Sequence, residues 1–140
     1  MALNKPKFWK IKNHFLSIIL IPLSLVYKLL LYFKKNFSGS HKFKIPIICV
    51  GNIYLGGTGK TPFAIFIANK LTKKNKNPAI LKKEYKDQYD EQNLIKKYFK
   101  NLVVKKDRID GIIEVEKLQY DSVILDDGLQ DYKIKKDLKI

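Results

Sequence analysis

Residues 45–61, IPIICVGNIYLGGTGKT, decide the fold class of this chain. An apolar and largely β-branched run from Ile45 to Val50 leads into a segment that holds four glycines and ends at Lys60 and Thr61. A buried strand, a glycine loop and the start of a helix are expected from residues in this order. The stretch therefore predicts an α/β fold of the kind that binds phosphate groups.

The glycine loop has the composition of a phosphate cradle. Glycines let backbone N–H groups approach an anion, and the N-terminus of the following helix adds a partial positive charge. A lysine at this place can reach the β- and γ-phosphates of a nucleotide, and the next hydroxyl can bind Mg²⁺. A glycine-rich turn before an ordinary helix is the alternative, because Tyr54 stands where the strict pattern has its first glycine. The candidate residues are Gly56, Gly57, Thr58, Gly59, Lys60 and Thr61.

Residues 122–130, SVILDDGLQ, are the second informative stretch. A short apolar strand ends there in Asp126 and Asp127. A carboxylate at the carboxyl edge of a neighbouring strand can hold a metal ion, or the water bound to it, opposite a glycine loop. Acidic residues also end strands simply as turn formers. Because a glycine loop precedes this stretch, we interpret Asp126, Asp127 and Thr61 as candidate ligands of Mg²⁺.

The other apolar segments between residues 45 and 140 predict the rest of a partial P-loop NTPase-like parallel sheet. Fewer than 100 residues are available for it, which is small for a nucleotide-binding α/β fold. The expected elements are a helix over 60–72, a strand over 78–81, a helix over 91–101, a strand over 102–104 and a last strand within 138–140.

Charge is distributed unevenly along the chain. The net charge is +15, and residues 1–83 contain 16 lysines but no Asp or Glu. Such asymmetry indicates an anionic partner, either phospholipid head groups or nucleic acid. We expect no nucleic acid, because no group of stacking aromatic residues accompanies the charge. The lone Cys49 excludes an internal disulfide and favours a reducing compartment.

Residues 15–33, FLSIILIPLSLVYKLLLYF, predict a membrane-associated helix behind a basic N-terminus. At 1.5 Å per residue the helix would be about 28 Å long, close to the thickness of the hydrocarbon layer. A polar stripe along one side also fits a helix that lies in the interface, so spanning and interfacial placement both stay open. A buried core helix and a secretory signal are further alternatives, but Lys28 interrupts the apolar run and no A-x-A-like cleavage site follows. The stripe consists of Ser17, Ser24, Lys28 and Lys35.

Three segments follow from these observations. Residues 1–35 form the basic N-terminus and the membrane-associated helix, residues 36–44 form a polar linker, and residues 45–140 form the partial P-loop domain.

VGNIYLGGTGKTP at 50–62 and ILDDGLQDYKIKKDLKI at 124–140 resemble the lipid A tetraacyldisaccharide 4'-kinases, which are membrane-associated P-loop enzymes of Gram-negative bacteria. The resemblance implies transfer of the γ-phosphate of ATP to the 4'-hydroxyl of a disaccharide lipid precursor, with Mg²⁺ as cofactor. It also implies that residues 45–140 are a partial P-loop kinase domain. The N-terminal helix would dock the enzyme at the cytoplasmic face of the inner membrane, where anionic lipids would attract the lysines. The alternative is a catalytically inactive, truncated and membrane-bound nucleotide-binding remnant of such a kinase.

The resemblance assigns roles to individual residues. Lys60 and Thr61 match the phosphate and metal positions, and Asp126, Asp127 and Gln130 match the second motif. Asp90, within YDEQN, resembles the aspartate of a family Gly-Asp-Glu-Pro segment that acts as base toward the sugar hydroxyl. One of the Asp126–Asp127 pair could accept the proton instead. Arg108, the only arginine, resembles a family Lys-Asp-Arg position that could face the phosphates.

Several positions depart from the family pattern. Asp131 stands where the family usually has His, and LKKEY at 81–85 replaces Leu-Ser-Arg-Gly-Tyr. The segment between Tyr85 and Asp90 is shorter than in the family, and the chain ends at Ile140 although family members are more than twice as long. We therefore expect little turnover from this chain alone, because the acceptor hydroxyl must be held in line with the γ-phosphate.

Overall fold

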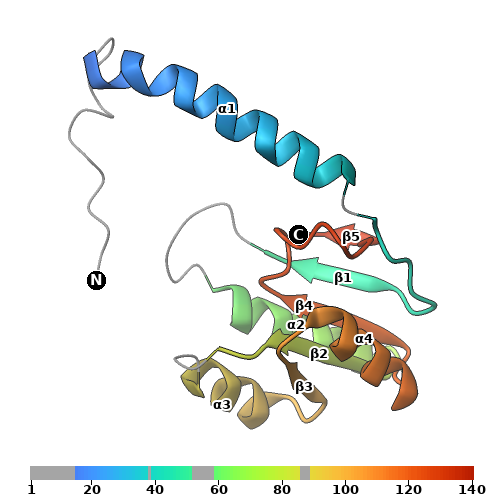
Figure 1. Cartoon of the computed structure of the whole chain (residues 1–140). Coiled ribbons are helices and arrows are strands. Elements are labelled where there is room, and N and C mark those ends of the chain that lie inside the picture. Colours follow the sequence, from blue (N-terminus) through green and yellow to red (C-terminus); the bar gives the residue numbers. More distant parts are fainter. Residues whose placement is uncertain (1–14, 38, 52–58, 86–88) are drawn as a thin grey trace. The chain divides into compact units, whose positions relative to one another are not determined.

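The computed structural model describes residues 15–37, 39–51, 59–85 and 89–140. The chain consists of two compact units, residues 1–39 and residues 40–140, which are described separately. The first contains one long helix, and the second contains a parallel sheet with helices on both faces (Figure 1).

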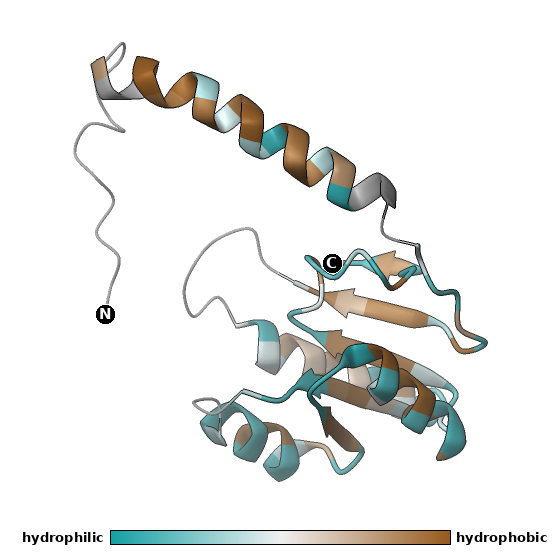
Figure 2. Cartoon of the chain, viewed as in Figure 1, coloured by the Kyte–Doolittle hydropathy of each residue, from teal (hydrophilic) through white to brown (hydrophobic). Residues whose placement is uncertain are grey.

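Helix α1 (Phe15–Phe37) makes up the described part of the first unit. It is mostly apolar, with a few polar positions between long apolar stretches (Figure 2). Its described large apolar side chains from Phe15 to Phe33 are exposed, except that of Leu31, which is half-buried. Pro22 lies inside the helix, and near it the Ser24 hydroxyl donates a hydrogen bond to the carbonyl of Ile21 over 2.7 Å. Among the described residues, no helix is both long enough and apolar enough to cross a membrane.

The second unit is built on a five-stranded parallel sheet with the strand order β3-β2-β4-β1-β5. β1 and β4 lie side by side, with Ile47 opposite Val123 and Val50 opposite Asp126. The strands are β1 (Ile47–Val50), β2 (Pro78–Lys83), β3 (Leu102–Lys105), β4 (Ser122–Asp126) and β5 (Leu138–Lys139).

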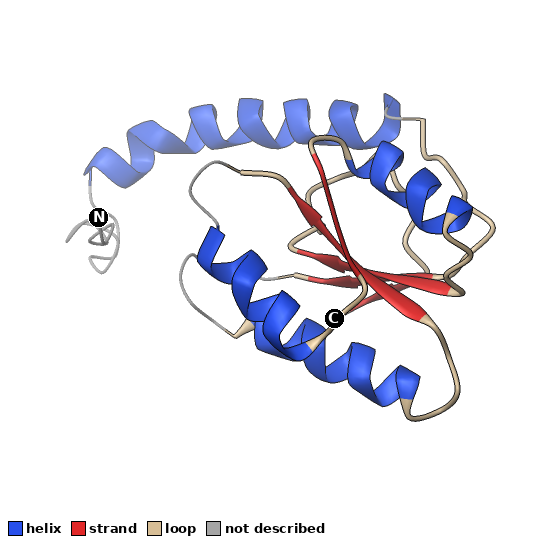
Figure 3. Cartoon of the chain, turned by 90° about the horizontal axis from the view of Figure 1, so that it is seen from below, coloured by secondary structure: helices blue, strands red, loops and turns tan. Residues whose placement is uncertain are grey.

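The helices cover both faces of this sheet (Figure 3). α2 (Lys60–Thr72) and α3 (Tyr89–Tyr98) connect strands that progress toward the β3 edge, whereas α4 (Arg108–Lys117) connects β3 back to β4. Crossovers between parallel strands are right-handed. A reversal in the direction of travel therefore puts α4 on the face opposite to α2 and α3.

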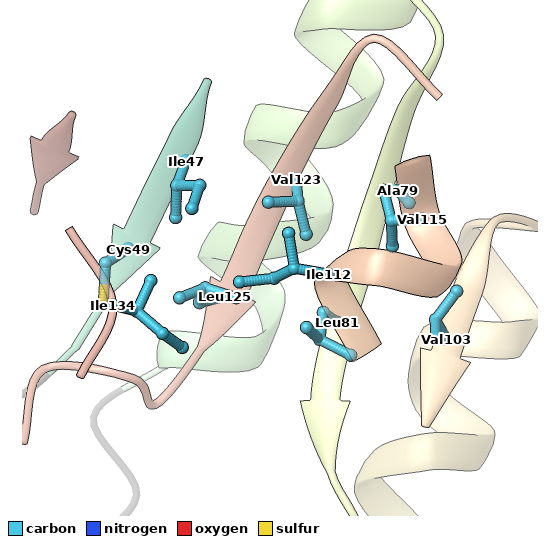
Figure 4. Close-up of a cluster of buried hydrophobic side chains, with 10 residues drawn as sticks. All are labelled: Ile47, Cys49, Ala79, Leu81, Val103, Ile112, Val115, Val123, Leu125 and Ile134. Carbon is cyan, nitrogen blue, oxygen red and sulfur yellow. The ribbon is translucent and has the colours of Figure 1, made fainter. Parts of the chain in front are cut away.

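The core consists of two hydrophobic clusters, one on each face of the sheet, because alternate residues of a strand point to opposite faces. On one face the small side chains of α2, Ala64 and Ala68, pack against Val50, Ile80 and Ile124. On the other face α4 inserts Ile112 and Val115 over the strands, as Figure 4 shows. The second cluster consists of Ile47, Cys49, Ala79, Leu81, Val103, Ile112, Val115, Val123, Leu125 and Ile134.

The structure confirms an α/β fold with a parallel sheet, and it changes some predicted bounds. β1 begins at Ile47 rather than Ile45, β2 runs on to Lys83, and α3 occupies Tyr89–Tyr98 rather than 91–101. α4 was not predicted at all. It begins after Asp107, whose carboxylate accepts a hydrogen bond of 2.7 Å from the backbone N–H of Ile109.

Candidate functional site

The candidate site lies at the carboxyl ends of β1, β2 and β4. β1 and β4 are neighbours, but the chain leaves β1 toward α2 on one face and leaves β4 toward a segment on the other face, where Ile134 joins the core. Such a reversal point in an open parallel sheet is where ligands bind in α/β folds. The sheet therefore brings the two sequence motifs to one edge.

The segments that follow β1 and β4 are in direct contact. The backbone N–H of Asp127 donates a hydrogen bond of 2.9 Å to the carbonyl of Val50. Gly51 lies so close to Leu129 that a Cβ at this position would come within 2.0 Å of the Leu129 Cγ. Both motifs depend on this close approach, because a side chain at position 51 would push the 127–130 segment away from β1.

Of the predicted phosphate cradle, Gly59, Lys60 and Thr61 are described, whereas Gly56, Gly57 and Thr58 lie outside the described residues. Gly59 caps α2 in the left-handed region, with φ of 75°, and no side chain forms a hydrogen bond with this cap. The first turn of α2 also contains no acidic residue. Its free N–H groups and helix dipole thus leave a positive partial charge available for an anion.

Thr61 and Asp126 meet at the base of the site. The Thr61 hydroxyl donates a hydrogen bond of 2.9 Å to Oδ2 of Asp126, and both side chains are buried. The other carboxylate oxygen of Asp126, Oδ1, is buried and has no hydrogen-bond partner among the residues that the structure describes. A buried carboxylate oxygen without a partner is costly unless it binds a donor or a cation. Thr61 and Asp126 therefore fit the hard oxygen ligands that Mg²⁺ prefers.

The described residues contain no group of three or more His, Cys, Asp or Glu side chains that could hold a metal by itself. This is compatible with Mg²⁺, which is commonly held by one or two carboxylates together with water and substrate phosphates.

Lys60 and Asp127 form an ion pair at the mouth of the site, with 3.0 Å between Nζ and Oδ1. Their side chains are 27% and 55% exposed, so solvent screens the attraction and the pair contributes little to stability. A phosphate could replace Asp127 as the partner of Lys60 at little cost. Asp127 has φ of 62°, a conformation that aspartate tolerates better than most residues.

Arg108, the first residue of α4, is buried and turned toward the segment after β4. Its Nη2 donates a hydrogen bond of 2.7 Å to the backbone carbonyl of Asp127, and its Nη1 lies 3.7 Å from Oδ2 of Asp131. Its Nε is buried without a partner. In this arrangement the guanidinium holds the loop that carries Asp127, and its predicted contact with phosphates stays a prediction.

Asp90 and Gln130 are exposed, Asp90 in the first turn of α3 and Gln130 in the segment after β4. Within the described part of the chain, no hydrogen bond or ion pair joins either of them to Lys60, Thr61 or Asp126. Their assignments as base and as nucleotide contact remain predictions.

Lys82 is a residue of the site that sequence reasoning missed. It lies near the carboxyl end of β2 with only 3% of its side chain exposed. Its Nζ is 3.0 Å from Oδ2 of Asp126 and is also bonded to the Glu91 carboxylate in the first turn of α3. A lysine that directly follows the apolar residues of a buried parallel strand was the available signal, because such a strand normally stays apolar.

Two opposing effects act on the pKa of Lys82. Burial lowers the pKa, but the hydrogen bond with Glu91 and the charge and hydrogen bond of Asp126 outweigh it, so the pKa lies above its usual value. The side chain is therefore a cation at neutral pH, balanced by two carboxylates.

Comparison with known proteins shows the family to which this chain is similar. The family model of LpxK, tetraacyldisaccharide-1-P 4'-kinase, matches residues 16–140. A tetraacyldisaccharide 4'-kinase of Pelagibacter ubique is 45% identical over 146 residues, covering 100% of this chain and 44% of the relative. One of Coxiella burnetii is 32% identical over 162 residues, covering 99% of this chain and 50% of the relative.

A solved structure supports the same relationship. A crystal structure of LpxK from Aquifex aeolicus in complex with ATP superposes with a TM-score of 0.69 and 32% sequence identity, covering 89% of this chain and 48% of that chain. This chain spans about half the length of the curated relatives it matches. The family model covers nearly all of it, and the chain belongs to the tetraacyldisaccharide-1-P 4'-kinase family.

Proposed function

We propose that residues 45–140 bind ATP with Mg²⁺ and supply the phosphoryl-donor side of a tetraacyldisaccharide 4'-kinase. One observation supports this most strongly. Lys60 and Thr61 at the start of α2 are joined to Asp127 and Asp126 at the end of β4, over 3.0 Å and 2.9 Å. This pairing of a lysine and a hydroxyl with strand-end carboxylates is what a magnesium nucleotide requires.

The proposed reaction moves the γ-phosphoryl group of ATP to the 4'-hydroxyl of a tetraacyldisaccharide 1-phosphate. A bond forms between the 4'-oxygen and the γ-phosphorus, and the bond from that phosphorus to the bridging oxygen of ADP breaks. The hydroxyl proton goes to a carboxylate, which is Asp90 or one of the Asp126–Asp127 pair. Lys60 neutralises charge on the phosphoryl oxygens, and Mg²⁺, when bound, adds to that neutralisation.

The residues that would hold Mg²⁺ are Thr61, Asp126 and Asp127. Asp126 offers the buried, unpartnered Oδ1, and Thr61 keeps the carboxylate oriented through its hydrogen bond to Oδ2. Gln130 and the loop residues Gly56, Gly57, Thr58 and Gly59 would contact the nucleotide.

We also propose that residues 1–35 attach the protein to anionic lipids at the cytoplasmic face of the inner membrane. The exposed apolar side chains of α1 and the lysine excess of the N-terminal part support interfacial attachment. Such a location would bring the nucleotide site to an acceptor that is itself a lipid. Residues 36–44 would then act as the linker.

The test is transfer of radiolabelled γ-phosphate to a tetraacyldisaccharide 1-phosphate in mixed micelles, with a full-length family member assayed alongside. The wild-type chain should label the acceptor more than tenfold more slowly than that member, and Lys60→Ala should abolish the label. If the chain binds nucleotide but transfers no label to the acceptor, it is the catalytically inactive nucleotide-binding remnant described as the alternative. Turnover that survives Lys60→Ala would contradict the proposed site.

A further inference from the structure

The ammonium group of Lys82 joins two carboxylates from different elements. One is Asp126 at the end of β4, with a side chain 1% exposed, and the other is Glu91 in the first turn of α3, with a side chain 50% exposed. β2 and β4 are neighbouring strands in which Lys82 lies opposite Asp126. The sheet register therefore fixes the position of the lysine opposite Asp126, and among the described helical residues Glu91 is the one that bonds to it.

A buried lysine at position 82 calls for a physical explanation. Removing an ammonium group from water is costly even when it is paired, and an apolar residue of similar volume often stabilises a fold as well or better. The neighbours of Lys82 in β2, from Pro78 to Leu81, are all buried and apolar. The charge at position 82 thus breaks the pattern of its own strand at the point where the candidate metal site begins.

The surroundings of Asp126 indicate what this charge does. Its Oδ2 accepts hydrogen bonds from both the Thr61 hydroxyl and the Lys82 ammonium, whereas Oδ1 is buried and no described residue bonds to it. Two donors on one oxygen fix the orientation of the carboxylate and leave the other oxygen available to a donor or a cation. The lysine also neutralises the charge that would otherwise attract a divalent cation on its own.

We propose that Lys82 is a positioning residue that serves as the built-in counter-cation of Asp126, so that a divalent cation binds tightly there only together with a nucleotide. Without nucleotide, the ammonium repels a second cation and balances the charge of Asp126. When nucleotide is bound, its negatively charged phosphates add to the attraction of Asp126 for the divalent cation, and the cation then binds tightly. Through Glu91, the same ammonium ties the first turn of α3, which carries Asp90, to the metal-binding carboxylate. This inference rests on the proposed Mg²⁺–ATP site.

The test uses Mn²⁺ as the probe and omits nucleotide, so it requires neither ATP binding nor turnover. The free Mn²⁺ in titrations of the full chain is measured by electron paramagnetic resonance. Lys82→Met should bind Mn²⁺ at least tenfold more tightly than wild type, because Asp126 has lost its counter-cation. Lys82→Arg, which keeps the charge, should retain weak binding. The double variant Lys82→Met/Asp126→Asn should bind Mn²⁺ no more tightly than wild type.

Equal Mn²⁺ affinity in folded Lys82→Met and wild type would overturn the proposal, and so would tight binding in Lys82→Arg. If Lys82→Met is unfolded in metal-free buffer, Mn²⁺ should restore its circular dichroism spectrum. A variant that stays unfolded at saturating Mn²⁺ would show that Lys82 is needed only for folding, which also overturns the proposal. Failure of the proposed kinase activity would be seen separately, in the ATP-binding and transfer assays on wild type.

Discussion

Asp126 is the residue at which the fold and the proposed metal site meet. Its Oδ2 is held by Thr61 and Lys82, while its Oδ1 is buried and has no partner in the described part of the chain. A purely structural carboxylate would be expected to use both oxygens. We therefore attribute the free oxygen to a ligand of the site.

The first prediction concerns the dependence of ATP binding on Mg²⁺. Asp126→Asn keeps the size of the side chain but removes the charge that attracts the metal, so ATP affinity should become nearly the same with Mg²⁺ and with a chelator. Titration calorimetry under both conditions measures this ratio. Asp121→Asn is the matched control, because Asp121 lies just before the opposite end of β4 and bonds the N–H of Asn77. If Mg²⁺ raises the ATP affinity of Asp126→Asn as much as that of wild type, Asp126 does not bind the metal.

The second prediction concerns Cys49, which is buried in β1. Burial raises the pKa of its thiol above the usual value of 9.0, although the Lys136 ammonium opposes this. The unfolded thiol therefore ionises first, and the free energy of unfolding contributed by Cys49 falls as the pH rises beyond about 9.0. Urea unfolding at pH 8 and pH 10 should show a larger loss for wild type than for Cys49→Ala. Equal losses would mean that the thiol is not buried as described.

At the scale of elements, the sequence predicted some helices and strands and not others. The strand–loop–helix unit around Lys60 and the strand before Asp126 were predictable, because each is a continuous apolar run with distinct ends. α4 was not predicted, although Asp107 is a suitable N-cap and Ile109, Ile112 and Val115 recur at helical spacing. Gly111 in the middle of this segment obscured the pattern, since glycine disfavours helices.

The site was predictable to a similar extent. The residues with chemical signatures, Lys60, Thr61, Asp126 and Asp127, meet as expected at one edge of the sheet. Lys82 was missed because its pairing depends on the register between β2 and β4, which one sequence does not reveal. Arg108 was assigned to the phosphates from its resemblance to a family Lys-Asp-Arg position, whereas its nearest partner is the backbone carbonyl of Asp127.

The third prediction concerns Gly111 in α4. A Cβ at position 111 would come within 2.4 Å of Cδ1 of Leu81, which is fully buried in β2. Alanine would gain about 1 kcal/mol from helix propensity, but overpacking a core costs about 1–3 kcal/mol. Gly111→Ala should therefore lower the free energy of unfolding by up to about 2 kcal/mol in urea titrations. Gly39→Ala is the control, since nothing lies within 4 Å of a Cβ there. A stabilised Gly111→Ala variant would contradict the described packing of α4 on β2.

At the scale of the whole molecule, charge and apolar surface are both concentrated toward the N-terminus. Residues 1–83 contain 16 lysines and no acidic residue, and α1 exposes most of its apolar side chains. A cationic segment followed by an exposed apolar helix is typical of attachment to an anionic membrane surface.

The fourth prediction tests this attachment without shortening the chain. Leu23→Asp/Leu30→Asp should abolish co-sedimentation with phosphatidylglycerol vesicles in ~0.15 M salt, where surface charges are screened beyond roughly 8 Å. Both leucines are exposed on α1, so the fold of residues 40–140 should be unaffected. Leu118→Asp, an exposed position at the end of α4, serves as the control. Undiminished binding of the double variant would exclude α1 as the anchor.

The most direct test of the central claim, that the ends of β1 and β4 form a site for Mg²⁺ and ATP, is a calorimetric titration of the chain with ATP in Mg²⁺. Wild type should bind, and Lys60→Ala should bind at least tenfold more weakly, because Lys60 supplies the mobile positive charge at the phosphates. Lys70→Ala, on the last turn of α2, should bind as wild type does. Absence of detectable heat at millimolar ATP, or equal affinity in Lys60→Ala and wild type, would contradict the account.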